Sequence, residues 1–152
     1  MLIPLICNVC GGKMEVDPDR HIGVCKYCDS AFVIPQNLGH KENLYNRAIF
    51  LRRHCEFDRG VSAYEDILRE DNSDAEAHWG LVLSKYGIEY VRDPNTQKYF
   101  PTCHRTQGES ILSDPDYLEA IDKAKPEAKK VIKEEAERIN TIQSRILEIS
   151  QK

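Results

Sequence analysis

The 152-residue sequence lacks any long apolar run and any excess of positive charge. No segment approaches the ~20 consecutive apolar residues of a membrane-spanning helix, so we expect none. Lys and Arg together number 21 and Asp and Glu 25, which gives a formal net charge of -4. General binders of nucleic acid or of anionic membranes need a positive field. The charge balance argues against both and leaves only a local basic patch for such a role.

Sequence patterns of catalytic sites and of secretion are also missing. The chain has no phosphate-binding glycine loop, no nucleophile elbow and no HExxH motif. Its first seven residues, MLIPLIC, contain neither a basic region nor a long apolar region, and Ile6 is too bulky to precede an acylated lipoprotein cysteine. We therefore expect a cytoplasmic chain that is not an enzyme. With 41% apolar and 30% charged residues, it has the composition of a globular protein rather than a disordered one.

Cysteine spacing is the strongest chemical signal in the sequence. Four of the six cysteines form two CxxC pairs separated by 14 residues, namely Cys7, Cys10, Cys25 and Cys28. Each pair can hold one metal ion, and four thiolates suit tetrahedral Zn²⁺. Two disulfides are disfavoured without a secretion signal, and a thioredoxin-like redox motif would need a surrounding βαβ pattern that is missing. We therefore predict one zinc ion bound by these four residues.

The residues around the cysteines predict a zinc ribbon over residues 1–35. Residues 13–17 and 22–25 have strand character and are separated by a turn at 18–21, so we expect them to form a hairpin that brings the two CxxC pairs together. A third strand is expected at 31–34. About 35 residues cannot bury enough core alone, so the ion should supply folding energy. Four thiolates leave no coordination position for a substrate, so the predicted ion is structural.

The predicted ribbon has little that would bind nucleic acid. Lys13, Arg20 and Lys26 are its basic residues, against four carboxylates. Tyr27 and Phe32 could stack on bases, but without a basic surround we interpret both as core aromatics.

After a polar linker at 36–40, apolar residues recur at helical spacing. One face carries Leu44, Ala48 and Leu51, a second helix is indicated around residues 61–68, and a third begins near Ala75. The third helix contains Trp79 and Tyr86, which we expect to pack in the core rather than line a peptide groove.

These helices resemble a tetratricopeptide repeat, whose unit is 34 residues. Residues 41–74 match one full unit, in which Gly60 stands where the family has a small Ala, and residues 71–74 close it with the sequence DNSD. Residues 75–91 match part of a second unit. Such repeats normally need about three units for stability, so this resemblance implies that the remaining helices cap the array.

The C-terminal part is expected to contain a loop at 92–112 and helices over 113–152. A long helix begins near Pro126, and Ile132, Ile139 and Ile146 recur every seven residues in it, with Ile142 and Ile149 offset by three. We favour packing of this helix on the repeat over an intermolecular coiled coil, and self-association through it is the alternative. The expected fold class is thus a small β zinc ribbon followed by an all-α tetratricopeptide-like domain, 41–152, with a long C-terminal helix.

Two further residue pairs, His54-Cys55 and Cys103-His104, could converge as a second metal site, since each offers a thiol and an imidazole. Adjacent ligands make poor chelate geometry and the two pairs lie far apart in the sequence, so we favour ordinary, partly buried thiols. Cys103 and His104 also suggest a nucleophile and a base, but neighbours in a strand point to opposite faces. The role of Arg105 beside them is not assigned. For Glu134 and Glu135, ion pairing on a solvated helix is the favoured role.

The order of parts is similar to the N-terminal region of bacterial proteins in which a zinc ribbon and a short helical region precede a Toll/interleukin receptor (TIR) domain. The similarity lies in residues 7–12 (CNVCGG), 25–28 (CKYC), 78–91, 101–105 (PTCHR) and 142–149. It implies a non-catalytic region that binds a protein partner or controls an attached effector, and an attached TIR domain either cleaves NAD or assembles signalling complexes. The alternative function is a ribbon-based nucleic-acid-binding module.

Overall fold

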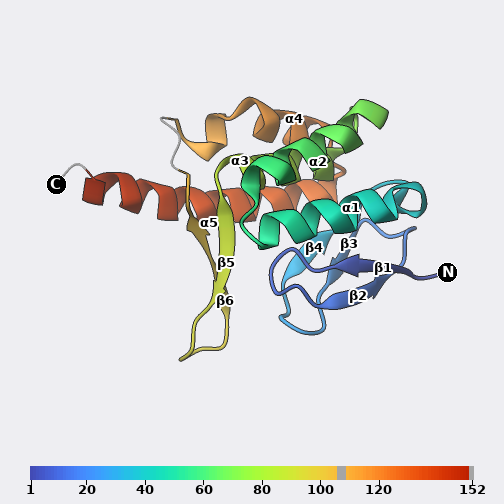
Figure 1. Ribbon diagram of the computed structural model, residues 1–152, viewed down its shortest axis with the longest axis horizontal. Helices are drawn as coiled ribbons and strands as arrows, with labels where there is room; N and C mark the ends of the chain where they lie inside the picture. The colour runs from blue at the N-terminus through green and yellow to red at the C-terminus, as the bar shows by residue number, and fades with distance from the viewer. Residues whose placement is uncertain (106–108, 151–152) are drawn as a thin grey trace.

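The N-terminal part of the chain consists of two small antiparallel hairpins. The computed structural model describes residues 1–105 and 109–150, with side chains described as far as Ile146. Strand β1 (Ile3–Ile6) pairs with β2 (Lys13–Val16), and β3 (Ile22–Val24) pairs with β4 (Ala31–Val33). Figure 1 shows the two hairpins lying together beneath the first helix. Together with the four clustered cysteines described below, they fit a zinc ribbon.

The strand pairing differs from the expectation. The strands expected at 13–17, 22–25 and 31–34 are present to within one or two residues, but β2 and β3 do not pair with each other, and β1 was not expected at all. The reason is that each CxxC pair itself forms the turn of a hairpin. Cys7 donates its backbone N–H to Gly12 at 2.9 Å and Cys25 donates to Ser30 at 2.9 Å, closing the two turns.

Three consecutive helices follow, α1 (Leu38–Arg53), α2 (Phe57–Glu70) and α3 (Ala75–Lys85). α2 packs against both α1 and α3. The third helix begins at a typical cap, in which the Asp74 carboxylate accepts a hydrogen bond from the backbone N–H of Ala77 at 3.2 Å. The helices indicated by the apolar spacing are therefore present, with α1 starting three residues before the expected Lys41.

A β-hairpin follows the third helix. Strand β5 (Ile88–Arg92) pairs with β6 (Tyr99–Cys103) and extends away from the helices (Figure 1). The helix before it ends at Lys85, and Gly87, which lies between the helix and β5, has a φ of +61°, a backbone conformation that favours glycine. The loop expected at 92–112 was therefore wrong for residues 99–103, whose extended backbone is hydrogen-bonded to β5 as a strand.

The C-terminal helices cover the other side of α3. They are the short 3₁₀ turn η1 (Ile111–Ser113), α4 (Pro115–Lys123) and α5 (Pro126–Ser150). The long helix does begin at Pro126, and Ile132 and Ile139 of its heptad series are buried inside the chain. Ile132 and Ile139 therefore pack within the chain, where α5 mainly contacts β6, β4, η1 and α4. Self-association through this helix stays a prediction. The side chain of Ile149 lies outside the described residues.

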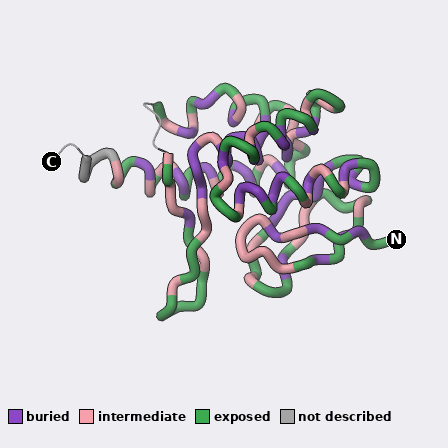
Figure 2. The backbone as a smooth tube through the Cα atoms, viewed as in Figure 1, coloured by how far each residue is buried: buried purple, intermediate pink, exposed green. Residues whose placement is uncertain are grey.

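The core has two clusters of buried side chains. Figure 2 marks the buried residues along the backbone. The first is shared between the ribbon and the first three helices and includes Leu5, Met14, Tyr45 and Ile49. The second joins α3, the base of the hairpin and α5, and it contains Trp79, Tyr86, Ile88, Ile132 and Ile139. Trp79 and Tyr86 are core residues as expected. The ribbon does not have a core of its own, because its apolar side chains pack directly on α1.

Among the described residues, no helix is both long enough and apolar enough to cross a membrane.

Candidate metal centre

The four cysteines of the two CxxC pairs come together at the turns of the ribbon hairpins. Their Sγ atoms all lie within 4.8 Å of one another. Cys7 Sγ is 3.8 Å from Cys28 Sγ, and Cys10 Sγ is 3.8 Å from Cys25 Sγ. The structure thus brings together all four residues that the sequence predicts as ligands, and a group of four thiols at these distances could bind a metal ion.

Backbone N–H groups of each turn point at the sulfur atoms. Val9 donates to Cys7 Sγ, Gly12 to Cys10 Sγ and Tyr27 to Cys25 Sγ, each at 3.4 Å. Donors of this kind stabilise negative charge on sulfur, as outer hydrogen bonds do for metal-bound thiolates. Their geometry comes from the tight turns themselves.

The thiols differ in how readily they ionise. Burial raises the pKa of Cys7 and also that of Cys10, because a buried thiolate loses hydration. Burial acts in the same direction on Cys28, but hydrogen bonding with Ser30, whose Oγ is 3.3 Å from Cys28 Sγ, outweighs it and lowers the pKa of that thiol. A bound cation would favour the thiolate form of all four residues, so the donor set fits a metal that binds sulfur.

A metal ion would also connect two parts of the ribbon that are otherwise separate sheets. Among the described residues, neither strand of the β1–β2 hairpin pairs with a strand of the β3–β4 hairpin. One thiol pair belongs to each hairpin turn, so one ion would join the turns. All four positions of a tetrahedral ion would then be filled by protein.

The two ribbon aromatics occupy different environments. Phe32 is buried in the core as expected, but Tyr27 is 59% exposed, so its interpretation as a core residue was wrong. The Lys26 ammonium lies 5.2 Å from the centre of the Tyr27 ring. Tyr27 lies between the two cysteines of the second turn.

The side chains of Cys103 and His104 diverge, as expected for neighbours at a strand end. Cys103 Sγ donates a hydrogen bond to the Tyr86 carbonyl at 3.2 Å, whereas His104 Nε2 lies 2.8 Å from Glu89 Oε1. The thiol and imidazole are therefore not arranged as nucleophile and base. The ligand atoms of His104, Cys55 and Glu89 instead lie within 4.8 Å of one another, so the two pairs do approach each other, although the sequence interpretation disfavoured this. Each pair contributes only one side chain, Glu89 was not foreseen, and Cys55 is exposed rather than partly buried.

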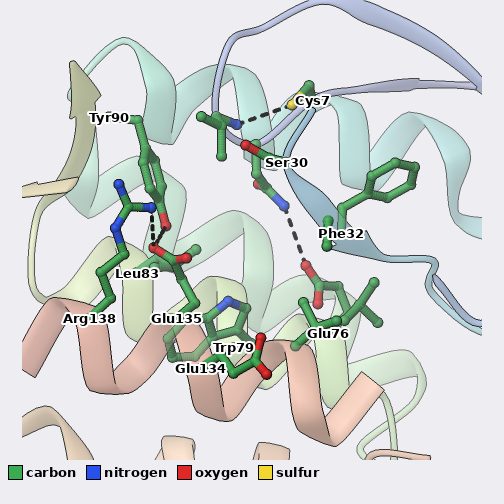
Figure 3. A pocket seen from close by; sticks show the side chains of 15 residues that line it. Cys7, Ser30, Phe32, Glu76, Trp79, Leu83, Tyr90, Glu134, Glu135 and Arg138 are labelled. Atoms are coloured by element: carbon green, nitrogen blue, oxygen red, sulfur yellow. Dashed lines mark hydrogen bonds and ion pairs between the residues drawn. The ribbon is translucent and has the colours of Figure 1, made fainter. Parts of the chain in front are cut away.

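A cavity of about 340 Å³ lies where the ribbon, α3, the hairpin base and α5 meet. Figure 3 shows Glu134, Glu135 and Arg138 rising from α5 towards it. Tyr90 donates its hydroxyl hydrogen to Glu135 at 2.8 Å, and Arg138 is 3.6 Å from the same carboxylate. Ion pairing was thus the right expectation for Glu135. The cavity could not be predicted from the sequence, since its walls come from segments far apart in the chain.

The cavity contains an unusual buried carboxyl group. Glu76 is 6% exposed, and its Oε1 accepts a hydrogen bond from the Asn8 side chain at 3.4 Å. Its Oε2 has no hydrogen-bond partner in the part of the chain that the structure describes. Burial, reinforced by the nearby carboxylate of Asp74, raises the pKa of Glu76 well above its ordinary value. An oxygen that lacks a partner at a cavity wall is a place where a ligand donor would be stabilised.

Comparisons of this chain with protein-family models, with curated proteins and with solved structures find no match.

Proposed function

We propose that this chain is a non-catalytic, zinc-organised region that binds a protein partner through the cavity between the ribbon and α5. The single observation that supports it best is the cavity itself, whose walls combine aromatic rings with an excess of carboxylates. Because Cys7 and Phe32 of the ribbon form one wall, the ion that orders the ribbon would also order the binding site. Metal binding and partner binding are thus parts of one function.

Zinc is the ion we propose for the four-cysteine centre. Four thiolates at the turns of two hairpins are the usual ligand set of structural Zn²⁺. With no position left for water, this ion contributes folding energy and no chemistry.

The partner we propose presents a lysine or arginine side chain to the cavity. Glu134 and Glu135 line it against the guanidinium of Arg138, and Trp79 contributes an aromatic ring. Glu76 adds a buried carboxyl group, whose raised pKa favours the protonated form. Carboxylates attract a cation, and aromatic faces stabilise it further when water is excluded. The volume is at the lower end of the range for small-ligand sites, which suits one long side chain of a protein segment.

We propose further that the helices form a tetratricopeptide-like array. The Lys41 ammonium, at the first position of the 34-residue unit, bonds Asp71 and Asp74 at its end, both at 2.9 Å. Neighbouring helices approach closely at glycines, since a Cβ at Gly60 would lie 2.9 Å from Ser84 Oγ. Both features support a compact repeat unit, although β5 takes the place of the next helix.

The location of this region before a TIR domain in a larger cytoplasmic bacterial protein is also a proposal, supported by the sequence resemblance. The residues encoded directly after Lys152 test it. A TIR domain there would support control of an attached effector, and an unrelated sequence or a stop codon would count against it.

Peptide display on the immobilised, zinc-loaded chain tests the docking proposal. We expect enrichment of peptides that contain a lysine or arginine, and loss of their binding in Glu134→Arg, which places a positive charge at the cavity. Glu127→Arg makes the same charge change on an exposed position of α5 outside the cavity lining and is the matched control. Enriched peptides without a basic residue, or equal binding by both variants, would refute the proposed site.

Nucleic-acid binding is the second candidate, favoured by the exposed Tyr27 ring beside Lys26. Fluorescence anisotropy with DNA and RNA oligonucleotides over a salt series separates the two functions. Tight binding with a steep salt slope, abolished by Tyr27→Ala together with Lys26→Glu, would favour nucleic acid. We expect weak binding instead, because the ribbon carries more acidic than basic residues.

A further inference from the structure

Three side chains of metal-binding types meet on the surface at the base of the β5–β6 hairpin. They are the Cys55 thiol, the Glu89 carboxylate and the His104 imidazole, and their ligand atoms all lie within 4.8 Å of one another. Each comes from a different element, because Cys55 follows α1, Glu89 lies in β5 and His104 follows β6. This group is separate from the four-cysteine centre and from the cavity.

The backbone holds each of the three residues in place. Cys55 has a φ of +60° and donates its N–H to the Arg52 carbonyl at 2.9 Å, which fixes the direction of its side chain beyond the end of α1. Glu89 follows Ile88, whose carbonyl accepts a hydrogen bond from the buried Arg52 side chain. His104 donates its N–H to the Gly87 carbonyl at 2.9 Å. The arrangement thus depends on ordered backbone rather than on long flexible side chains.

The imidazole is further positioned by packing. The rings of His104 and Phe57 have their centroids 5.8 Å apart with planes tilted by 36°. His104 Nε2 and Glu89 Oε1, 2.8 Å apart, already face one another. The side chains of His104 and Glu89 are 48% and 37% exposed, and Cys55 is exposed, so an ion from solvent could reach all three.

We propose that Cys55, Glu89 and His104 bind a second divalent transition-metal ion, Zn²⁺ or an ion of similar preference, with a solvent molecule as the remaining ligand. Thiolate, imidazole and carboxylate are the three side-chain ligand types that Zn²⁺ accepts. A thiolate and a carboxylate carry two negative charges, which balance the charge of the ion. On binding, the Cys55 thiol would release its proton to solvent, and the Glu89–His104 hydrogen bond would be replaced by bonds to the metal.

Three protein ligands with one exchangeable position distinguish this site from the four-cysteine centre. An ion held this way is accessible to chelators and to outside ligands, whereas four thiolates close the coordination sphere. It would also join the end of α1 to both strands of the hairpin. The inference does not depend on the proposed partner-binding function.

Metal stoichiometry of the full chain tests the site. The protein is purified under reducing conditions, titrated with Zn²⁺ and passed through a desalting column, and bound zinc is measured by elemental analysis. We expect two ions per chain in the wild type and one in Cys55→Ser and in His104→Ala. The matched controls are Cys103→Ser and His54→Ala, which change the neighbouring residue of each pair, and both should retain two ions.

Cobalt substitution supplies an independent readout. Co²⁺ in the second site should add a thiolate charge-transfer band that is lost in Cys55→Ser and present in Cys103→Ser. Circular dichroism of each variant checks that the fold is kept. Glu89→Gln serves as a nearly isosteric third variant. It should weaken binding of the second ion at least 10-fold, within the usual range for loss of a ligand contact. Any of three results would overturn the proposal. They are a wild type that binds a single ion, a second ion bound more weakly than about 10 µM, and a Cys55→Ser variant that retains two ions.

Discussion

The guanidinium of Arg52 donates a hydrogen bond to the backbone carbonyl of Ile88 at 2.8 Å, from a side chain that has no exposed surface. The same guanidinium donates to the backbone carbonyl of Asn8 in the first CxxC turn. One buried side chain of α1 therefore links the ribbon to the base of the hairpin. Loss of its donors would remove both hydrogen bonds of this link.

Replacement of Arg52 by lysine should destabilise the fold. A single ammonium cannot reach both carbonyls with the fork geometry of a guanidinium, so we expect a loss of about 2–5 kcal/mol in the free energy of unfolding. Chemical denaturation of zinc-loaded protein measures it. Arg47→Lys, the same change at an exposed position of α1, should alter stability by less than about 0.5 kcal/mol. Equal effects of the two variants would contradict the linking role of Arg52.

Removal of the metal should loosen more than the ribbon. Because Leu5 and Met14 share a core cluster with Tyr45 and Ile49, we expect chelation or Cys10→Ser to reduce hydrogen-exchange protection in residues 3–33 and also in α1. Protection in α5, which belongs mainly to the other cluster, should fall less. Cys103→Ser leaves the four ligands intact and should show the wild-type pattern. Unchanged protection after chelation would rule out a structural ion.

Glu76→Gln should stabilise the protein at neutral and alkaline pH. The folded-state pKa of Glu76 is raised above the reference value of 4.5, so the protonated form is favoured by folding. Its contribution to stability is present below the unfolded-state pKa and is lost as the pH rises towards the folded-state pKa. An amide remains neutral throughout, and we expect Tm to rise by at least about 2–4 °C at pH 8 in E76Q, with a smaller gain at pH 5.5.

Thermal unfolding of the wild type and of E76Q between pH 5.5 and pH 8 checks the expectation for Glu76. Glu127→Gln, at an exposed carboxylate of α5, is the control. Its Tm should differ from that of the wild type by nearly zero at every pH. A gain in E76Q that is independent of pH would show that burial of charge is not its cause.

Two glycine-to-alanine changes should have opposite consequences. A Cβ at Gly80 would lie 2.1 Å from the buried Tyr64 ring, so Gly80→Ala must displace that ring and should cost about 1–3 kcal/mol. A Cβ at Gly39 would meet only Ile3 Cδ1, at an ordinary 3.7 Å, and Gly39→Ala lies in the first turn of a helix. We expect it to be neutral or to stabilise by up to about 1 kcal/mol. The denaturation midpoints of the two variants measure these effects. A Gly80→Ala variant with unchanged stability would contradict the close α2–α3 packing.

Local spacing in the sequence predicted the features that depend on neighbouring residues. The four clustered thiols follow from the CxxC spacing, because two intervening residues make a tight turn whose sulfurs face the same way. The positions of α1 to α3 follow from apolar periodicity, and the start of α5 follows from Pro126. Burial of Ile132 and Ile139 follows from their seven-residue spacing. In each case, the information lies within one or two turns of chain.

Only the tertiary structure decided which distant segments meet. Strand pairing in the ribbon depended on the CxxC turns closing β1 on β2 and β3 on β4, which strand propensity alone cannot indicate. The pairing of β5 with β6 placed strands at the end of the predicted partial second unit, 75–91, and in the predicted loop, 92–112. The cavity at Glu76, and the approach of Cys55 to Glu89 and His104, arise from contacts between elements far apart along the chain. Local periodicity carries no information on such contacts, because they are set by how the buried faces of whole elements pack together.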